Sequence, residues 1–171
     1  EVSLAAKYEG EYLSLNHPKY KEKYSDSQLC TVLARSFADI GDIIRGKDLY
    51  IRNKQEKDRL EENLRKIFKK IYEELSRTST SDKNGELQKR YNGDEDKNFF
   101  KLREDWWTAN RDQVWEAITC DVHGSDYFRR TCSNDQSWTN HNCRCGDGDV
   151  NIVPTYFDYV PQYLRWFEEW A

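Results

Sequence analysis

The fold is decided by the stretch Leu33-Ala34-Arg35-Ser36-Phe37-Ala38-Asp39-Ile40-Gly41-Asp42-Ile43-Ile44-Arg45-Gly46. In and just before this stretch, apolar side chains recur at steps of three and four, which places them on one face of a helix. They are Leu29, Val32, Leu33, Phe37, Ile40 and Ile44. Asp26 or Ser27 would cap the start of this helix, and Gly46 would end it. The pattern predicts an amphipathic helix over residues 26–45.

Three further segments have the same periodicity. Residues 55–76 place Leu60, Leu64, Ile67, Phe68, Ile71 and Leu75 inward, and residues 98–119 do so with Phe99, Leu102, Trp106, Val114 and Ile118. Trp107 would lie at the margin of that second face. Residues 160–170 begin with Pro161 in the first turn and would bury Val160, Leu164, Phe167 and Trp170. With no alternating strand pattern, the prediction is an all-α bundle of about four long helices.

Two insertions separate these helices. Residues 76–97 lack apolar periodicity and are predicted to form an exposed, flexible loop. Residues 121–152 are rich in Gly, Asp, Asn and Cys. We expect this second segment to keep its shape through disulfides and through packing of Tyr127, Phe128 and Trp138 on the bundle.

Size and composition fit one soluble domain. The chain has 171 residues, of which 37% are hydrophobic and 34% charged, and 14% are aromatic. Aromatic rings bury about 150–250 Å² each, which compensates for the polar composition. No apolar run approaches the ~20 residues of a membrane helix. Met is absent even at position 1, which favours a piece of a longer protein.

The five cysteines are Cys30, Cys120, Cys132, Cys143 and Cys145. An odd number in an oxidising compartment leaves one thiol to pair outside the chain. A zinc site from Cys132, His141, Cys143 and Cys145 is the alternative, but Cys-x-Cys is tighter than the usual zinc spacing. Disulfides are therefore the preferred interpretation.

The sequence argues against an enzyme and against a bound cofactor. His17, His123 and His141 all stand in polar, loop-like contexts, and no glycine-rich phosphate loop occurs. Asp39 and Asp42 could share a helix face, but salt bridges to Arg35 or Arg45 are the better explanation for them.

Charge distribution is the feature that points to a ligand. The net charge is −4, which disfavours a general nucleic-acid binder, yet residues 45–72 hold ten basic and five acidic residues. The predicted polyanion site consists of Arg65, Lys66, Lys69 and Lys70, with Arg45, Lys47 and Arg52 as a flanking patch. Glu62 precedes Lys66 by four residues, so the alternative is a solvated face with weak ion pairs.

Several blocks together resemble the alpha class of Duffy-binding-like domains from the malaria parasite's erythrocyte membrane protein one. Besides Leu33 to Gly46, the blocks are Phe100-Lys101-Leu102-Arg103-Glu104-Asp105-Trp106-Trp107-Thr108-Ala109-Asn110-Arg111, Val114-Trp115-Glu116-Ala117-Ile118-Thr119-Cys120, Tyr127-Phe128-Arg129-Arg130-Thr131-Cys132, Cys143-Arg144-Cys145 and Val153-Pro154-Thr155-Tyr156-Phe157-Asp158-Tyr159-Val160-Pro161-Gln162-Tyr163-Leu164-Arg165-Trp166-Phe167-Glu168-Glu169-Trp170. The resemblance covers nearly all of residues 29–171.

This resemblance implies a single partial domain, residues 1–171, centred on the family's helical middle subdomain, with residues 153–171 leading into the next. It implies an adhesion module outside the infected erythrocyte, in a larger membrane-anchored protein. The segment itself would contact no membrane. Partners would be host glycans such as heparan sulphate, complement receptor one or adjacent domains of the same antigen, with roles in rosetting or cytoadhesion. The alternative is a structural spacer with immune-variable loops.

For the cysteines, the resemblance favours a Cys30–Cys120 bridge. Cys132 would pair with Cys143 or Cys145, and the cysteine left over from those two would bond outside the chain. Any aromatic ring that proves exposed is a candidate carbohydrate-stacking surface.

Overall fold

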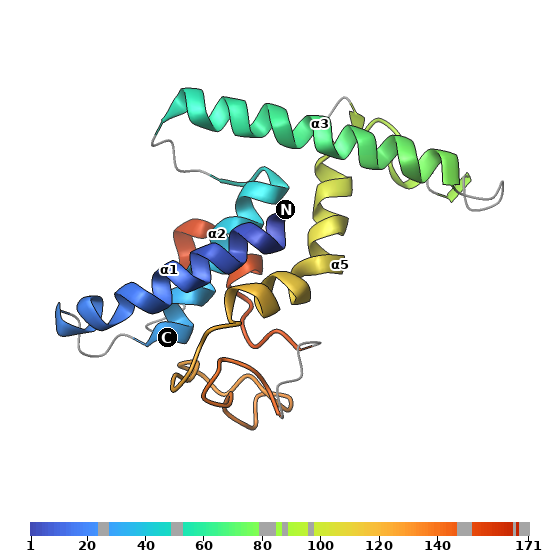
Figure 1. Ribbon diagram of the computed structural model, residues 1–171. Coiled ribbons are helices and arrows are strands. Elements are labelled where there is room, and N and C mark those ends of the chain that lie inside the picture. Colours follow the sequence, from blue (N-terminus) through green and yellow to red (C-terminus); the bar gives the residue numbers. More distant parts are fainter. Residues whose placement is uncertain are drawn as a thin grey trace. The chain divides into compact units, whose positions relative to one another are not determined.

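The computed structural model describes residues 1–23, 28–48, 53–78, 85–86, 89–95, 98–146, 152–165 and 167. Its long helices are α1 (Val2–Lys23), α2 (Leu29–Arg45), α3 (Lys54–Thr78) and α5 (Phe100–Ile118), shown in Figure 1. Two 3-10 turns follow, η2 (Phe157–Tyr159) and η3 (Gln162–Leu164). Within these ranges, β pairing is limited to the isolated bridges Ser125–Asn142 and Cys132–Ser137. The all-α prediction is confirmed.

The predicted end of α2 is also confirmed. Gly46 follows the last helical residue with a φ of +71°, and the Lys47 amide donates to the Asp42 carbonyl oxygen at 2.7 Å. This is the backbone arrangement that glycine favours just after a helix. The proposed caps at the other end, Asp26 and Ser27, lie outside the described residues.

Side-chain acceptors fix the starts of α3 and α5. Asn53 Oδ1 accepts the Gln55 and Glu56 amide protons at 3.1 and 3.3 Å. The Asp94 carboxylate accepts those of Lys101 and Leu102 at 3.0 and 2.9 Å. These bonds satisfy amide groups that have no partner inside the helix.

The prediction of an exposed loop over 76–97 is therefore wrong in part. Helix α3 continues to Thr78, and Tyr91 and Asp94 are buried. Asp94 is buried where its carboxylate accepts hydrogen bonds from the first backbone amides of α5. Residues 79–84, 87–88 and 96–97 lie outside the described part of the chain.

Helix α1 was not predicted. Its inward face holds the small residues Ala6 and Gly10, whereas large apolar residues lie on its exposed side, so the sequence shows no single apolar stripe. Pro18 further weakens the pattern. His17, expected in a loop, lies in this helix.

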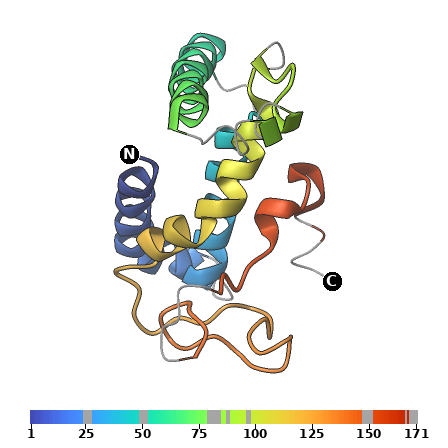
Figure 2. The same cartoon turned by 90° about the vertical axis from the view of Figure 1, so that its right-hand side faces the viewer.

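The chain divides into two compact units. Unit 1 comprises Glu1–Gly41 and Asn110–Ala171, and unit 2 comprises Asp42–Ala109. In unit 1 the rings of Phe37 and Trp115 meet edge to face at 5.2 Å, and both are fully buried. Figure 2 shows α1 and the C-terminal segment on either side of α2.

In unit 2, Leu64 and Phe68 of α3 and Leu102 and Trp107 of α5 are buried. The prediction had the tryptophans reversed. Trp107 is fully buried, whereas Trp106 is only half-buried and meets the Phe68 ring edge-on at 6.1 Å. Leu60 and Ile67 of α3, predicted to point inward, are exposed because the buried stripe is narrower than the sequence pattern.

Residues 119–146 form an irregular loop closed by two disulfides, Cys30–Cys143 and Cys132–Cys145. The predicted Cys30–Cys120 bridge is wrong, and Cys120 is the free cysteine. The Cys30 amide donates to Ser125 Oγ at 3.2 Å, and Ser125 bridges to Asn142. These contacts bring Cys143, not Cys120, beside the start of α2.

Of the two predictions made for Cys132, Cys143 and Cys145, one is confirmed and one is wrong. The Cys132–Cys145 bridge is one of the two pairings predicted for Cys132. The prediction that Cys143 or Cys145 bonds outside the chain is wrong, because both are used here. Trp138, expected to pack on the bundle, is exposed instead, with the Arg130 guanidinium 5.5 Å from its ring.

The predicted helix over 160–170 is present only in part: Gln162–Leu164 form the 3-10 turn η3 with Pro161 before it, and Arg165 and Phe167 are helical. Leu164 and Phe167 are exposed, so the predicted buried stripe is wrong. The buried side chain is Arg165, whose Nε donates to the carbonyl oxygens of Phe157 and Val160 at 2.9 and 3.1 Å. Trp166 and residues 168–171 lie outside the described part.

Candidate polyanion-binding surface

The outward face of α3 carries four neighbouring cations. Leu64 and Phe68 point into unit 2 and fix the rotation of the helix. An α-helix turns by about 100° per residue, so the first and second residues after each of these buried side chains are rotated by about 100° and 200° around the helix axis. Both positions therefore face solvent. These positions hold Arg65, Lys66, Lys69 and Lys70, all of which are exposed. We call these four residues the basic strip.

Few acidic groups neutralise the basic strip. Lys66 forms an ion pair with Glu62, one turn earlier, at 3.2 Å. Both partners are largely exposed, so the pair is weak and screened by salt. Within the described part of the chain, no ion pair involves Arg65, Lys69 or Lys70. Three of the four cations are therefore free to meet an external anion.

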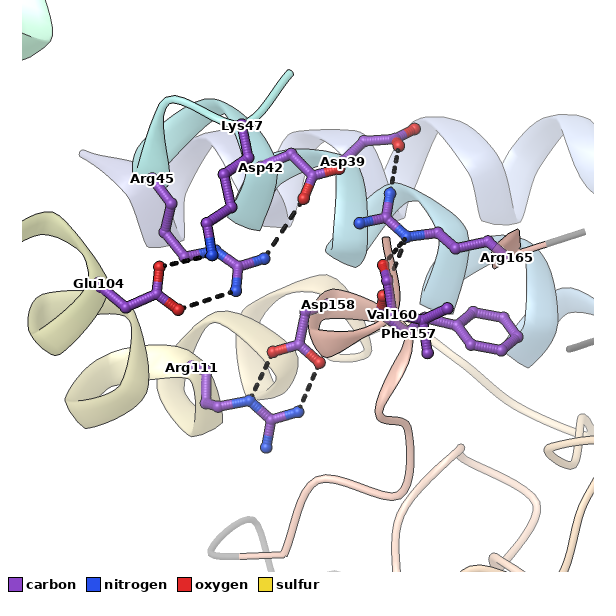
Figure 3. A network of polar contacts seen from close by, with 10 residues as sticks. All are labelled: Asp39, Asp42, Arg45, Lys47, Glu104, Arg111, Phe157, Asp158, Val160 and Arg165. Carbon is purple, nitrogen blue, oxygen red and sulfur yellow. Dashed lines mark hydrogen bonds and ion pairs between the residues drawn. The ribbon is translucent and has the colours of Figure 1, made fainter. Parts of the chain in front are cut away.

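Arg45 does not belong to this surface. Its side chain is 2% exposed and forms ion pairs with Asp42 at 3.3 Å and Glu104 at 3.5 Å. Its guanidinium lies 5.8 Å from the centroid of the Trp107 ring. Arg45 thus holds α2 and α5 together inside unit 2 (Figure 3).

Lys47 and Arg52 are the other two predicted flanking residues. Lys47 is exposed, but its Nζ lies 2.9 Å from Glu104 Oε2. Arg52 lies outside the described residues. Of the seven predicted glycan-binding residues, the structure therefore places four in one exposed group.

Two arginines of unit 1, Arg111 and Arg165, form ion pairs inside the unit. Arg111 donates to both carboxylate oxygens of Asp158, at 2.7 and 2.8 Å, and Asp158 is buried (Figure 3). Arg165 pairs with Asp39 at 3.3 Å. The salt-bridge interpretation is confirmed for Asp42, which pairs with Arg45, and Asp39 forms an ion pair with Arg165.

Two of the three histidines have charged neighbours. His141 lies 3.1 Å from Asp126, and burial together with Lys21 lowers the pKa of His17. In the described ranges, no three His, Cys, Asp or Glu side chains are grouped so as to hold a metal ion. Likewise, none of the helices described is long and apolar enough to cross a bilayer.

Comparison with known proteins identifies the family. Residues 1–165 match the model of the Duffy binding domain. The chain belongs to this family. A match of that extent includes all of unit 2 with the basic strip and all of unit 1 except residues 166–171.

Two solved structures are similar to this Duffy binding domain. One is the NTS-DBL1(alpha-1) domain of Plasmodium falciparum membrane protein 1 (PfEMP1) from the varO strain, with 46% identity and a TM-score of 0.72. The other is the NTS-DBL1-alpha and CIDR-gamma double domain of PfEMP1 from the same strain, with 45% identity and a TM-score of 0.70. No curated protein matches the chain.

Both matches include nearly the whole of this chain but only part of the relative. The alignments cover 99% and 96% of the residues here, against 36% and 22% of the two solved chains. This chain thus corresponds to about a third of the first structure and less than a quarter of the second.

Proposed function

We propose that this Duffy binding domain segment is part of an adhesion module on the surface of the infected erythrocyte, and that its basic strip binds sulphated glycans of the host cell. The observation that carries the proposal is the group of four exposed cations within six residues of α3, three of which form no ion pair with any residue that the structure describes. The similarity to PfEMP1 domains supports the adhesive role and the extracellular location.

Electrostatics favour a linear polyanion as the ligand. Because residues 45–72 carry five more basic than acidic residues in a chain of net charge −4, the rest of the chain repels anions. The basic strip spans about 7.5 Å along the helix axis, at 1.5 Å per residue. Arg65 can bind two sulphate oxygens at once through its guanidinium group, whereas the lysines act as point charges.

Retention on immobilised heparin tests the proposal. The double change Lys66→Glu and Lys69→Glu should shift elution to clearly lower salt, because two attractive charges become repulsive. Both positions are exposed and both residue types favour helix, so circular dichroism should show unchanged helicity.

The matched control is Lys19→Glu with Lys21→Glu. It makes the same change in net charge at two exposed positions of α1. If both double variants elute together, net charge and not the basic strip governs retention. If the unmodified protein flows through at physiological salt, the spacer role is the better account of the segment.

A further inference from the structure

Helix α1 exposes its largest apolar side chains. Leu4, Tyr8, Tyr12 and Leu15 are 53%, 61%, 63% and 79% exposed. Their spacing of four, four and three places them on one side of the helix, over about 16 Å of its length. We call these four residues the α1 stripe.

The rotation of α1 is fixed by tight contacts on its other side. A Cβ atom added to Gly10 would lie 2.1 Å from the Ile118 carbonyl oxygen, so the α1 backbone touches the end of α5. Ala6 is fully buried, and Glu9 Oε1 accepts the Ser36 hydroxyl proton at 2.9 Å. Turning the α1 stripe inward would replace these small residues with bulky ones. Its exposure therefore follows from the packing.

Figure 2 shows α1 at one side of unit 1, and the four side chains of the α1 stripe are exposed. A contiguous exposed apolar patch of this kind usually marks an interaction surface. Helices pack by fitting rows of side chains spaced three and four residues apart into matching grooves. The α1 stripe offers such a row to a second helix.

The area favours a partner from the same polypeptide. At about 200 Å² for each complete side chain, the α1 stripe exposes roughly 500 Å². A stable contact between separate chains needs about 800 Å² a side. A covalently connected segment avoids the loss of translational freedom and can dock on the smaller area. The first matched structure is long enough to supply one, because this chain corresponds to only 36% of it.

From this geometry we propose that the α1 stripe is the docking site for an amphipathic helix of the parent polypeptide, outside residues 1–171. The inference does not rest on glycan binding by α3. The docked helix would present apolar residues at helical spacing to Leu4, Tyr8, Tyr12 and Leu15. The tyrosine hydroxyls would remain at the wet edge of the contact.

Photo-crosslinking in the parent polypeptide, at the length of the first matched structure, tests this proposal. A p-benzoylphenylalanine replaces Tyr8 or, in a second variant, Tyr12, and tryptic peptides are mapped after irradiation. The control places the same group at Lys21, an exposed α1 position outside the stripe. The expected product is a monomer crosslinked from the stripe to a peptide outside residues 1–171, at least fivefold above the control.

Other products would overturn the proposal. A crosslinked dimer would assign the α1 stripe to a second copy. Crosslinks only within residues 1–171, or yields equal to the Lys21 control at both stripe positions, would show that no external helix docks there. Circular dichroism and the unfolding midpoint of each variant confirm that the comparison is between folded proteins.

Discussion

Arg103 is fully buried in unit 2, and its guanidinium group connects three helices there. Nε and Nη2 donate to the carbonyl oxygens of Ile44 and Ile43 at 2.6 and 3.2 Å, at the C-terminal end of α2. Nη2 also donates to Glu61 of α3 at 3.0 Å. A cation is favoured at a helix C-terminus, where carbonyl oxygens lack partners.

Replacing Arg103 with Met should therefore destabilise unit 2 strongly. The change keeps most of the side-chain volume but removes the Arg103 donors from Glu61 and the Ile44 carbonyl oxygen, whereas the Ile43 oxygen keeps the Gly46 amide as a donor. Leaving a buried carbonyl oxygen without a donor costs about 1–3 kcal/mol, and because Glu61 is 36% exposed, leaving it unpaired costs less than breaking a fully buried ion pair. Urea unfolding followed by circular dichroism measures the loss, with exposed Arg65→Met as the control. A loss below about 1 kcal/mol would contradict this account of Arg103.

Gly46 provides a second test at the level of one residue. A Cβ atom there would lie 2.6 Å from Phe100 Cε1, and the φ of +71° disfavours any side chain. Gly46→Ala should cost about 1–3 kcal/mol of unfolding free energy. Gly85→Ala is the control, because an added Cβ there meets no atom within 4 Å. Equal unfolding midpoints for the two variants would contradict the prediction.

At the scale of elements, one carboxylate fastens the segment 89–95 to α5. Asp105 accepts two bonds from Arg90, at 2.7 and 2.6 Å, and one from the Tyr91 hydroxyl at 2.7 Å. The Arg90 hydrogen bonds are the largest cause holding the pKa of Asp105 below its ordinary value of 3.8, and the Tyr91 bond acts in the same direction. Since the folded form has the lower pKa, ionised Asp105 stabilises the fold above pH 3.8 and loses this effect as the pH falls further.

Asp105→Asn should consequently have a pH-dependent effect. At neutral pH the variant should unfold at lower urea than the unmodified protein. Below about pH 3.8 the difference should shrink, because Asp105 is itself becoming protonated. A difference in unfolding free energy that stays constant between pH 7 and pH 2 would show that the carboxylate charge is not what fastens this segment.

Periodicity predicted the helices that bury a single apolar stripe. Helices α2, α3 and α5 lie within three residues of their expected bounds. It failed for α1, whose close contact with Ile118 requires small inward residues such as Gly10. At 160–170 it selected the wrong inward side chains, because the buried group is Arg165, a residue type that pattern reading assigns to the surface.

The sequence predicted the exposure of those candidate residues whose position depends only on their own helix. Arg65, Lys66, Lys69 and Lys70 are exposed because they follow buried Leu64 and Phe68 in the helical repeat. Arg45 could not be excluded in the same way: its pairing with Asp42 is local, but Glu104 and Trp107, which also contact it, lie far along the chain.

At the scale of the whole chain, two disulfides determine how the irregular loop is held. Cys30–Cys143 joins residues 113 apart in sequence, and Cys132–Cys145 joins residues 13 apart. The sequence could not select the first pairing, because the choice depends on where Ser125 and Asn142 bring the loop against α2. Cys120 forms no disulfide and lies near Lys7 and Glu11 of α1.

The two bridges and the free thiol should respond differently to substitution. In the chain-entropy model, losing a bridge that closes about 100 residues costs about 4–5 kcal/mol, and one that closes about 15 costs about 3 kcal/mol. The pair Cys30→Ser and Cys143→Ser should thus lower the unfolding free energy more than Cys132→Ser with Cys145→Ser, whereas Cys120→Ser should change it little.

Burial, with Asp121 nearby, raises the pKa of the Cys120 thiol, so iodoacetamide should label it without reductant but slowly at neutral pH. A non-reduced peptide map that joined Cys30 to Cys120 would contradict both the pairing and this order of stabilities.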